Sequence, residues 1–86
     1  MKFEFDPAKS QSNKEKHGID FIEAQVLWAD ENRIIFPART IDEERFILIG
    51  CVGQKHWTAI YTMRDENIRI ISVRRARKEE VSLYEG

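Results

Sequence analysis

The stretch Ile68–Glu80, which reads I-R-I-I-S-V-R-R-A-R-K-E-E, decides the fold of this chain. β-Branched aliphatic residues dominate its first half and predict a strand over 68–74, and its second half predicts a helix over 77–84. Such a strand must turn one face to a core and leave charge on the other face or at its ends. Guanidinium groups gathered in this way are either solvated or hold an anion. The basic residues of this region are Arg64, Arg69, Arg74, Arg75, Arg77 and Lys78.

Length and composition predict one domain over residues 1–86 with a modest hydrophobic core. Cys51, the single cysteine, lies in an apolar run and is interpreted as a core residue rather than a nucleophile. The N-terminus has no apolar leader, and no stretch approaches the ~20 apolar residues that span a membrane. We therefore expect a cytoplasmic protein that does not contact membranes and needs no metal or other cofactor.

The net charge of −1 gives no reason to expect nucleic acid as a partner, but the charges are unevenly distributed. Acidic residues cluster over 20–31 and 42–44, and basic residues cluster over 9–16 and 64–78. One surface is thus suited to phosphates and another to a protein of opposite charge. The alternative is that these charges simply solvate a small domain.

The N-terminal part predicts a short strand and two helices. Residues 3–5 alternate as in a strand with one apolar face. Asp6-Pro7 favours the start of a helix over 8–17 that is polar nearly all round, with its lysines on an open surface, and that ends at Gly18. A second helix should begin at Asp20, with a capping-box glutamate three residues later. Its apolar residues recur at helical spacing and should face the core: Phe21, Ala24, Leu27 and Trp28.

From residue 33 onward the hydrophobic period changes to that of strands. Strands are predicted over 33–36, 45–52, 57–64 and 68–74, joined by turns over 40–44, 53–55 and 65–67. Because the turns are short, the strands should form an antiparallel meander with Pro37 in an edge strand. The sequence therefore predicts an α+β fold. Two N-terminal helices pack on a four- to five-stranded, mainly antiparallel sheet, and a short helix follows at the C-terminus.

The register of the last hairpin decides where its side chains point. A three-residue loop over 65–67 places these residues on one polar face: Thr58, Ile60, Thr62, Arg64, Ile68, Ile70, Ser72 and Arg74. It places Trp57, Ala59, Tyr61, Met63, Ile71 and Val73 on the core face. A two-residue loop would reverse this sorting. Arg64 and Arg74 would stand at opposite ends of the hairpin, roughly 20 Å apart, too far to clamp one phosphate but suited to successive phosphates of RNA.

Seven short motifs, in order and spacing, resemble the BrnT family over nearly the whole chain. They are F-x-F-D from Phe3, K-x(3)-N-x(2)-K-H-G from Lys9, F-x-E-A from Phe21, E-E-R-x(3)-I-G from Glu43, T-x-R from Thr62, R-I-I-S-x-R-x-A from Arg69 and E-x(3)-Y from Glu80. Pro37 and Ala38 depart from the family pattern, because they lie where the second strand of the sheet should run on.

The resemblance implies a ribonuclease toxin of a bacterial type II toxin–antitoxin pair, with a fold similar to that of the RelE toxins. It also implies that the partner is the ribbon-helix-helix antitoxin BrnA and that the complex represses its own operon. A two-fold antitoxin dimer would give a heterotetramer that binds operator DNA through the antitoxin.

Metal-free RNA cleavage requires activation of the 2′-hydroxyl, cations around the phosphorane and an acid for the leaving oxygen. The candidate catalytic residues are His17, Glu44, Arg64, Arg74 and Tyr84. The candidate RNA-binding residues are Lys9, Lys16, Arg69, Arg75, Arg77 and Lys78. Arginines should stabilise charge rather than act as bases, and a helix C-terminus favours a protonated His17. No metal-ligand spacing such as H-E-x-x-H occurs.

Each candidate also has a structural interpretation. His17 could cap the C-terminus of its helix, and Glu44 could form an ion pair with Arg45. Arg75 and Arg77 could be solvated or paired with Glu79 and Glu80. Tyr84 could be half-buried with a free hydroxyl. His56, beside a turn, is interpreted as structural or exposed.

The leading functional hypothesis is an endoribonuclease toxin that inhibits translation and growth. The alternative is a non-catalytic RNA-binding or co-repressor scaffold protein that acts through its antitoxin. The sequence does not separate them, because RNA binding and RNA cleavage use the same residue types.

Overall fold

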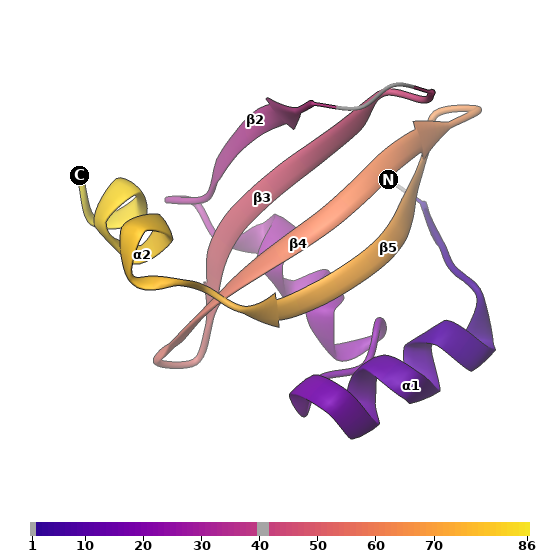
Figure 1. Cartoon of the computed structure of the whole chain (residues 1–86), viewed down its shortest axis with the longest axis horizontal. Helices are drawn as coiled ribbons and strands as arrows, with labels where there is room; N and C mark the ends of the chain where they lie inside the picture. Colours follow the sequence, from indigo (N-terminus) through magenta and orange to yellow (C-terminus); the bar gives the residue numbers. More distant parts are fainter. Residues whose placement is uncertain (1, 40–41) are drawn as a thin grey trace.

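The computed structural model describes residues 2–39 and 42–86. Along these residues the elements are β1 (Phe3–Glu4), α1 (Pro7–His17), the 3-10 helix η1 (Glu23–Ala29), β2 (Ile34–Ala38), β3 (Arg45–Val52), β4 (Lys55–Arg64), β5 (Asn67–Arg75) and α2 (Lys78–Glu85) (Figure 1). Thr40 and Ile41, which the sequence placed in a turn, lie outside the described residues. No helix within the described ranges is long and apolar enough to cross a membrane.

The described strands form a five-stranded mixed sheet in the order β1-β5-β4-β3-β2. Strands β2 to β5 form the predicted antiparallel meander, and Pro37 lies in the edge strand β2. The prediction missed one feature: β1 pairs in parallel with β5, with Phe3 opposite Ile68. The expectation of a mainly antiparallel sheet is therefore confirmed for the meander and incomplete for β1.

The predicted register of the last hairpin was wrong near its turn. The loop has two residues, Asp65 and Glu66, with φ of 52° and 70°, and Arg64 pairs with Asn67. Two successive residues of positive φ match the twist of a tight hairpin. A register shift between Ile60 and Tyr61 then restores the predicted pairing of Ile60 with Ser72 and of Thr58 with Arg74.

This bulge determines which aliphatic side chains of β5 enter the core. Ile68 and Ile70, predicted on the polar face, are only 3% and 2% exposed and belong to the core, whereas Ile71 is half-buried and lies outside it. Arg69, Ser72 and Arg74 remain on the other face, which we call the outer face. The bulge thus separates the aliphatic residues from the arginines, which strict alternation in the predicted register did not.

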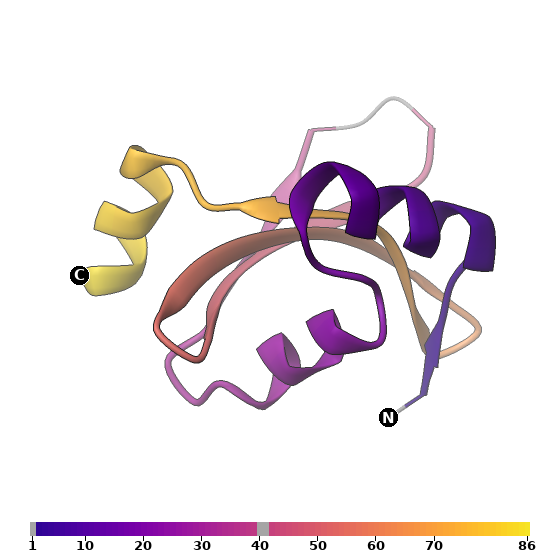
Figure 2. The same cartoon turned by 90° about the horizontal axis from the view of Figure 1, so that it is seen from below.

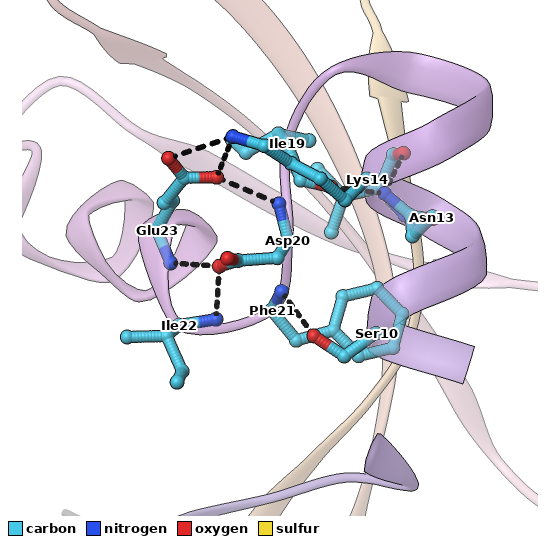
Figure 3. Close-up of polar contacts among 9 residues, drawn as sticks. Ser10, Asn13, Lys14, Ile19, Asp20, Phe21, Ile22 and Glu23 are labelled. Carbon is cyan, nitrogen blue, oxygen red and sulfur yellow. Dashed lines mark hydrogen bonds and ion pairs between the residues drawn. The ribbon is translucent and has the colours of Figure 1, made fainter. Parts of the chain in front are cut away.

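The core lies between the sheet and η1, which covers one face of the sheet (Figure 2). All four residues predicted to face the core are buried: Phe21, Ala24, Leu27 and Trp28. The predicted second helix is a 3-10 helix, however, with hydrogen bonds such as Gln25 N to Ile22 O at 3.2 Å. Its predicted capping box is present, because Asp20 accepts from Glu23 N at 2.7 Å and Glu23 accepts from Asp20 N at 2.9 Å (Figure 3).

α1 packs through polar side chains, which the sequence did not predict. It flanks β5 (Figure 1), and its Ser10 and Asn13 are each 7% exposed. Asn13 Nδ2 donates to Ile19 O at 2.8 Å and to Val73 O at 2.9 Å, and Val73 N donates to Asn13 Oδ1 at 3.2 Å. β1 pairs with Ile68 and Arg69. Farther along the same strand, the Asn13 amide forms hydrogen bonds with the backbone N–H and C=O of Val73. The helix is therefore packed into the fold through Ser10 and Asn13, while its lysines are exposed, as predicted.

Candidate nucleic-acid interface

The first residues of α2 are fixed to the sheet by one carboxylate. Arg74 Nη1 and Nη2 donate to the two Glu80 oxygens at 2.8 and 2.9 Å. Thr58 Oγ1 and the Arg77 amide donate to Glu80 Oε1 at 3.0 and 2.7 Å. The hydrogen bonds from Arg74 lower the pKa of Glu80 to about 2, although burial acts in the opposite direction. The same hydrogen bonds raise the pKa of Arg74, so both groups stay charged at neutral pH.

The far end of α2 is fixed by Tyr84. Its hydroxyl donates to Asp30 Oδ2 at 2.7 Å, so the expectation of a free hydroxyl was wrong. This hydrogen bond raises the pKa of Tyr84 and leaves its proton tied to Asp30. Burial pushes the pKa of Asp30 upward, but hydrogen bonds from Tyr84, Asn32 and Cys51 outweigh it and lower that pKa. The carboxylate therefore stays ionised and joins α2 to β3.

Gly50 gives Asp30 the room it needs beside β3. A Cβ at Gly50 would lie 3.3 Å from Asp30 Oδ2 and 3.4 Å from the side chains of Leu27 and Leu48. The small residue thus lets Asp30 approach the strand and accept from Cys51 N at 2.8 Å. This contact lies past Ile49, the last β3 residue paired with β2.

His56, which the sequence analysis did not select, lies on the outer face beside Arg74. Alternation along β4 places it on the face of Thr58, whose partner is Arg74, so that His56 and Arg74 are diagonal neighbours. Its ring meets that of Tyr84 edge-on at 5.0 Å, and its Nε2 lies 3.4 Å from Glu85 Oε2. The imidazole is therefore partly covered by α2 but remains 23% exposed. His56 is identified as a candidate site residue only by its position across the sheet from Arg74, which the register of the hairpin determines.

Basic residues gather where β4 starts, β5 ends and α2 begins. We call this group the basic end; its members are Lys55, His56, Arg74, Arg75, Arg77 and Lys78. Arg75 stacks over Trp57 at 5.4 Å, and its exposed guanidinium keeps its charge toward solvent. α1 runs alongside β5 (Figure 1), and its last turn carries the basic residues Lys14, Lys16 and His17. Such a concentration of cations favours an anionic partner.

The other predicted site residues do not join the basic end. Arg64 lies at the opposite end of the hairpin, as expected, and Glu44 lies near it, because its carbonyl accepts from Thr62 Oγ1 at 2.6 Å. Lys9 is exposed on the first turns of α1. Arg69 donates to Glu4 at 2.9 Å and ties β1 to β5. Arg45 pairs with Glu43 at 3.8 Å. The predicted catalytic residues thus fall into separate regions: Arg74 is bonded to the first turn of α2, and Tyr84 lies in the last turn of that helix.

Arg74 retains donors for a ligand despite its ion pair. Glu80 engages the two terminal nitrogens end-on, and Nη1 also donates to Arg75 O at 3.3 Å. Among the described residues, Nε has no hydrogen-bond partner. While Glu80 binds the ends of Nη1 and Nη2, the Arg74 guanidinium can still donate two parallel hydrogen bonds to a phosphate, one from Nε–H and one from the second proton of Nη2. We call this pair of donors the side-on fork. The side chain is 25% exposed, which leaves this edge within reach of solvent.

The Glu80 ion pair should make stability depend on acid pH. The pKa of Glu80 in the folded protein, about 2, lies below its ordinary value of 4.5, so the stabilisation from this ion pair is complete above pH 4.5 and is lost as pH falls toward 2. With Glu80 only 15% exposed, the shift corresponds to about 3 kcal/mol. We expect urea unfolding to show a steeper loss of stability between pH 5 and 2 in wild type than in Glu80→Gln. The exposed neighbour variant Glu79→Gln is the control and should retain the wild-type slope; equal slopes in all three proteins would contradict the assignment.

Comparison with protein-family models matches residues 5–80 to the family described as ribonuclease toxin, BrnT, of type II toxin–antitoxin system. No curated protein matches the chain. The family match covers nearly the whole chain, from Phe5 to Glu80, and it confirms the resemblance carried by the short motifs. This chain belongs to the BrnT family of ribonuclease toxins of type II toxin–antitoxin systems.

Proposed function

We propose that this BrnT toxin is a metal-independent endoribonuclease in which Arg74 holds the scissile phosphate at the basic end. The observation that carries the proposal is the state of Arg74: its guanidinium is fixed by Glu80, and its side-on edge has no partner among the described residues. Oriented cations that meet developing charge are the largest single contribution to many enzymatic rate enhancements. The guanidinium thus supplies the charge stabilisation for which other nucleases use a metal ion.

The chemistry that fits these residues is transesterification of RNA. The 2′-oxygen attacks the adjacent phosphorus, the bond to the 5′-oxygen breaks, and the products carry a 2′,3′-cyclic phosphate and a 5′-hydroxyl. The 2′-hydroxyl gives up a proton and the leaving oxygen gains one, so a side chain that can accept and donate a proton is needed beside the phosphate. His56, diagonal to Arg74 on the outer face, supplies an imidazole in that position. Lys16, His17, Arg75, Arg77 and Lys78 contribute contacts to flanking phosphates.

The antitoxin partner is implied by the family. We propose that it is a BrnA-like ribbon-helix-helix protein. Because such antitoxins are two-fold dimers, each dimer would hold two toxins, and the resulting heterotetramer would bind operator DNA through the antitoxin. The proposal rests on the resemblance of the motifs to the family.

The test is cleavage of a defined RNA by the purified toxin in EDTA, with a parallel reaction in Mg²⁺. We expect equal cleavage in both, with 2′,3′-cyclic phosphate ends on the fragments. Cleavage only with Mg²⁺ would overturn metal independence. Intact RNA in both reactions, together with normal growth of cells that express soluble toxin, would favour the co-repressor scaffold instead.

A further inference from the structure

We infer that Glu80 is a positioning residue for RNA cleavage: it holds the Arg74 guanidinium so that its side-on fork meets the scissile phosphate. The inference rests on the proposed function and adds the residue that makes Arg74 effective. Glu80 does not contact RNA in this arrangement, because both of its oxygens are engaged by protein donors.

The geometry makes Glu80 a rigid support. Four donors converge on its carboxylate: two guanidinium nitrogens, the Thr58 hydroxyl and the Arg77 amide. Thr58 is fully buried and stands directly opposite Arg74 on β4. The carboxylate is therefore fixed by one side chain from the sheet and one amide from the start of α2, and it transmits that position to Arg74. An arginine without such a partner would sample many rotamers.

The charges around Arg74 indicate which kinetic constant, kcat or KM, should depend on Glu80. Its negative charge partly offsets that of Arg74 and so weakens attraction of RNA in the ground state. Arg75, Arg77 and Lys78 follow Arg74 closely in the sequence, and all three are exposed, so the basic end keeps positive charge beside the pair. The neighbouring cations thus supply most of the RNA binding, whereas the fixed orientation of the Arg74 guanidinium affects the reacting phosphate. Loss of Glu80 should consequently lower kcat and leave KM nearly unchanged.

A purely structural role for Glu80 is the competing explanation, because the residue also anchors α2. Asp30 provides a matched control, since it anchors the opposite end of α2 through Tyr84 and has no contact with Arg74. Asp30→Asn should loosen α2 in the same way while leaving the Arg74–Glu80 pair intact. The two variants therefore separate anchoring of the helix from orientation of the guanidinium.

The experiment measures kcat and KM on one RNA oligonucleotide for wild type, Glu80→Gln and Asp30→Asn, with thermal unfolding of each protein. We expect Glu80→Gln to lower kcat about 10- to 100-fold, the effect of a misplaced catalytic group, with KM within about threefold. Asp30→Asn should keep the wild-type kcat below its melting temperature. Equal kcat losses in both variants, or a wild-type kcat in Glu80→Gln, would overturn the inference.

Two further variants keep the test decisive if Glu80→Gln folds poorly. Thr58→Val removes one hydrogen bond to Glu80 without changing charge, and we expect it to lower kcat several-fold. In an Arg74→Lys background, which lacks the fork, Glu80→Gln should have little additional effect on kcat, because its action passes through Arg74. Full additivity of the two changes would contradict positioning. If Arg74→Ala itself is fully active, the proposed function fails; if only Glu80→Gln is fully active, the proposed function stands without this inference.

Discussion

Replacing Arg74 by alanine should abolish toxicity, with kcat/KM for RNA cleavage reduced at least about 100-fold, the usual cost of removing a donor that stabilises transition-state charge. The physical reason is that Arg74 supplies the free guanidinium edge of the basic end and is held there by Glu80. The measurement is growth and bulk RNA integrity after induction of each protein in a bacterial host, followed by kinetics on the purified proteins. Growth arrest with cut RNA in wild type, and neither effect in Arg74→Ala, is the expected result.

Two controls define what this result means. Arg39→Ala removes an exposed arginine outside the basic end and should leave wild-type cleavage, which separates a specific effect from a general loss of positive charge. Arg74→Ala also leaves Glu80 without its main partner, so circular dichroism must show a folded protein. Arg74→Lys retains the charge but not the fork, and it should still lose activity at least about tenfold, because lysine does not replace arginine at a bidentate site. Wild-type cleavage by folded Arg74→Ala would refute the proposed site.

Replacing Asn13 by alanine should cause the largest loss of stability that we expect from a single polar residue of this chain. Its amide satisfies Ile19 O, Val73 O and Val73 N, and the side chain is 7% exposed. Each buried group left without a partner costs about 1–3 kcal/mol, so we expect the free energy of unfolding to fall by about 3–5 kcal/mol. Urea unfolding measures this change.

Gln11 supplies the matched control for Asn13. It is an exposed amide two residues earlier on α1, so Gln11→Ala should change stability by no more than about 0.5 kcal/mol. If Asn13→Ala proved as mild as Gln11→Ala, the amide would not be required at the β5 edge, and α1 would be held by other contacts.

The sequence predicted the parts of the fold that depend on local patterns. Hydrophobic period and short turns gave the meander, and helical spacing identified the buried face of η1, including Leu27 and Trp28. The turn over 65–67 was predicted, but the three-residue loop was preferred to the two-residue loop that forms, because neither Asp65 nor Glu66 is glycine although both adopt positive φ. The bulge was missed because no local residue pattern marks it; it shifts the register between Ile60 and Tyr61 and so offsets the shorter turn. Asn13 was missed because a polar residue on a polar helix gives no sign of burial.

The candidate site was predictable only in part, for a similar reason. The density of basic residues pointed to Arg74, and the glutamate three residues after Arg77 is the pattern of a capped helix start. The contact of Tyr84 with Asp30 joins residues 54 positions apart, and the location of His56 depends on the hairpin register. The first feature required the assembled sheet, whereas the second follows from the pairing of Thr58 with Arg74.

The parallel pairing of β1 with β5 also limits when this protein can fold during synthesis. β1 and α1 are made early, yet their partners Ile68 and Val73 belong to the last of the five described strands. Until that strand leaves the ribosome, the N-terminal segment has no sheet edge to join, and the nascent chain holds neither a closed core nor Arg74. A translating ribosome therefore carries an unfinished toxin, and RNA-cleaving activity can arise only once β5 has been made and can pair with β1.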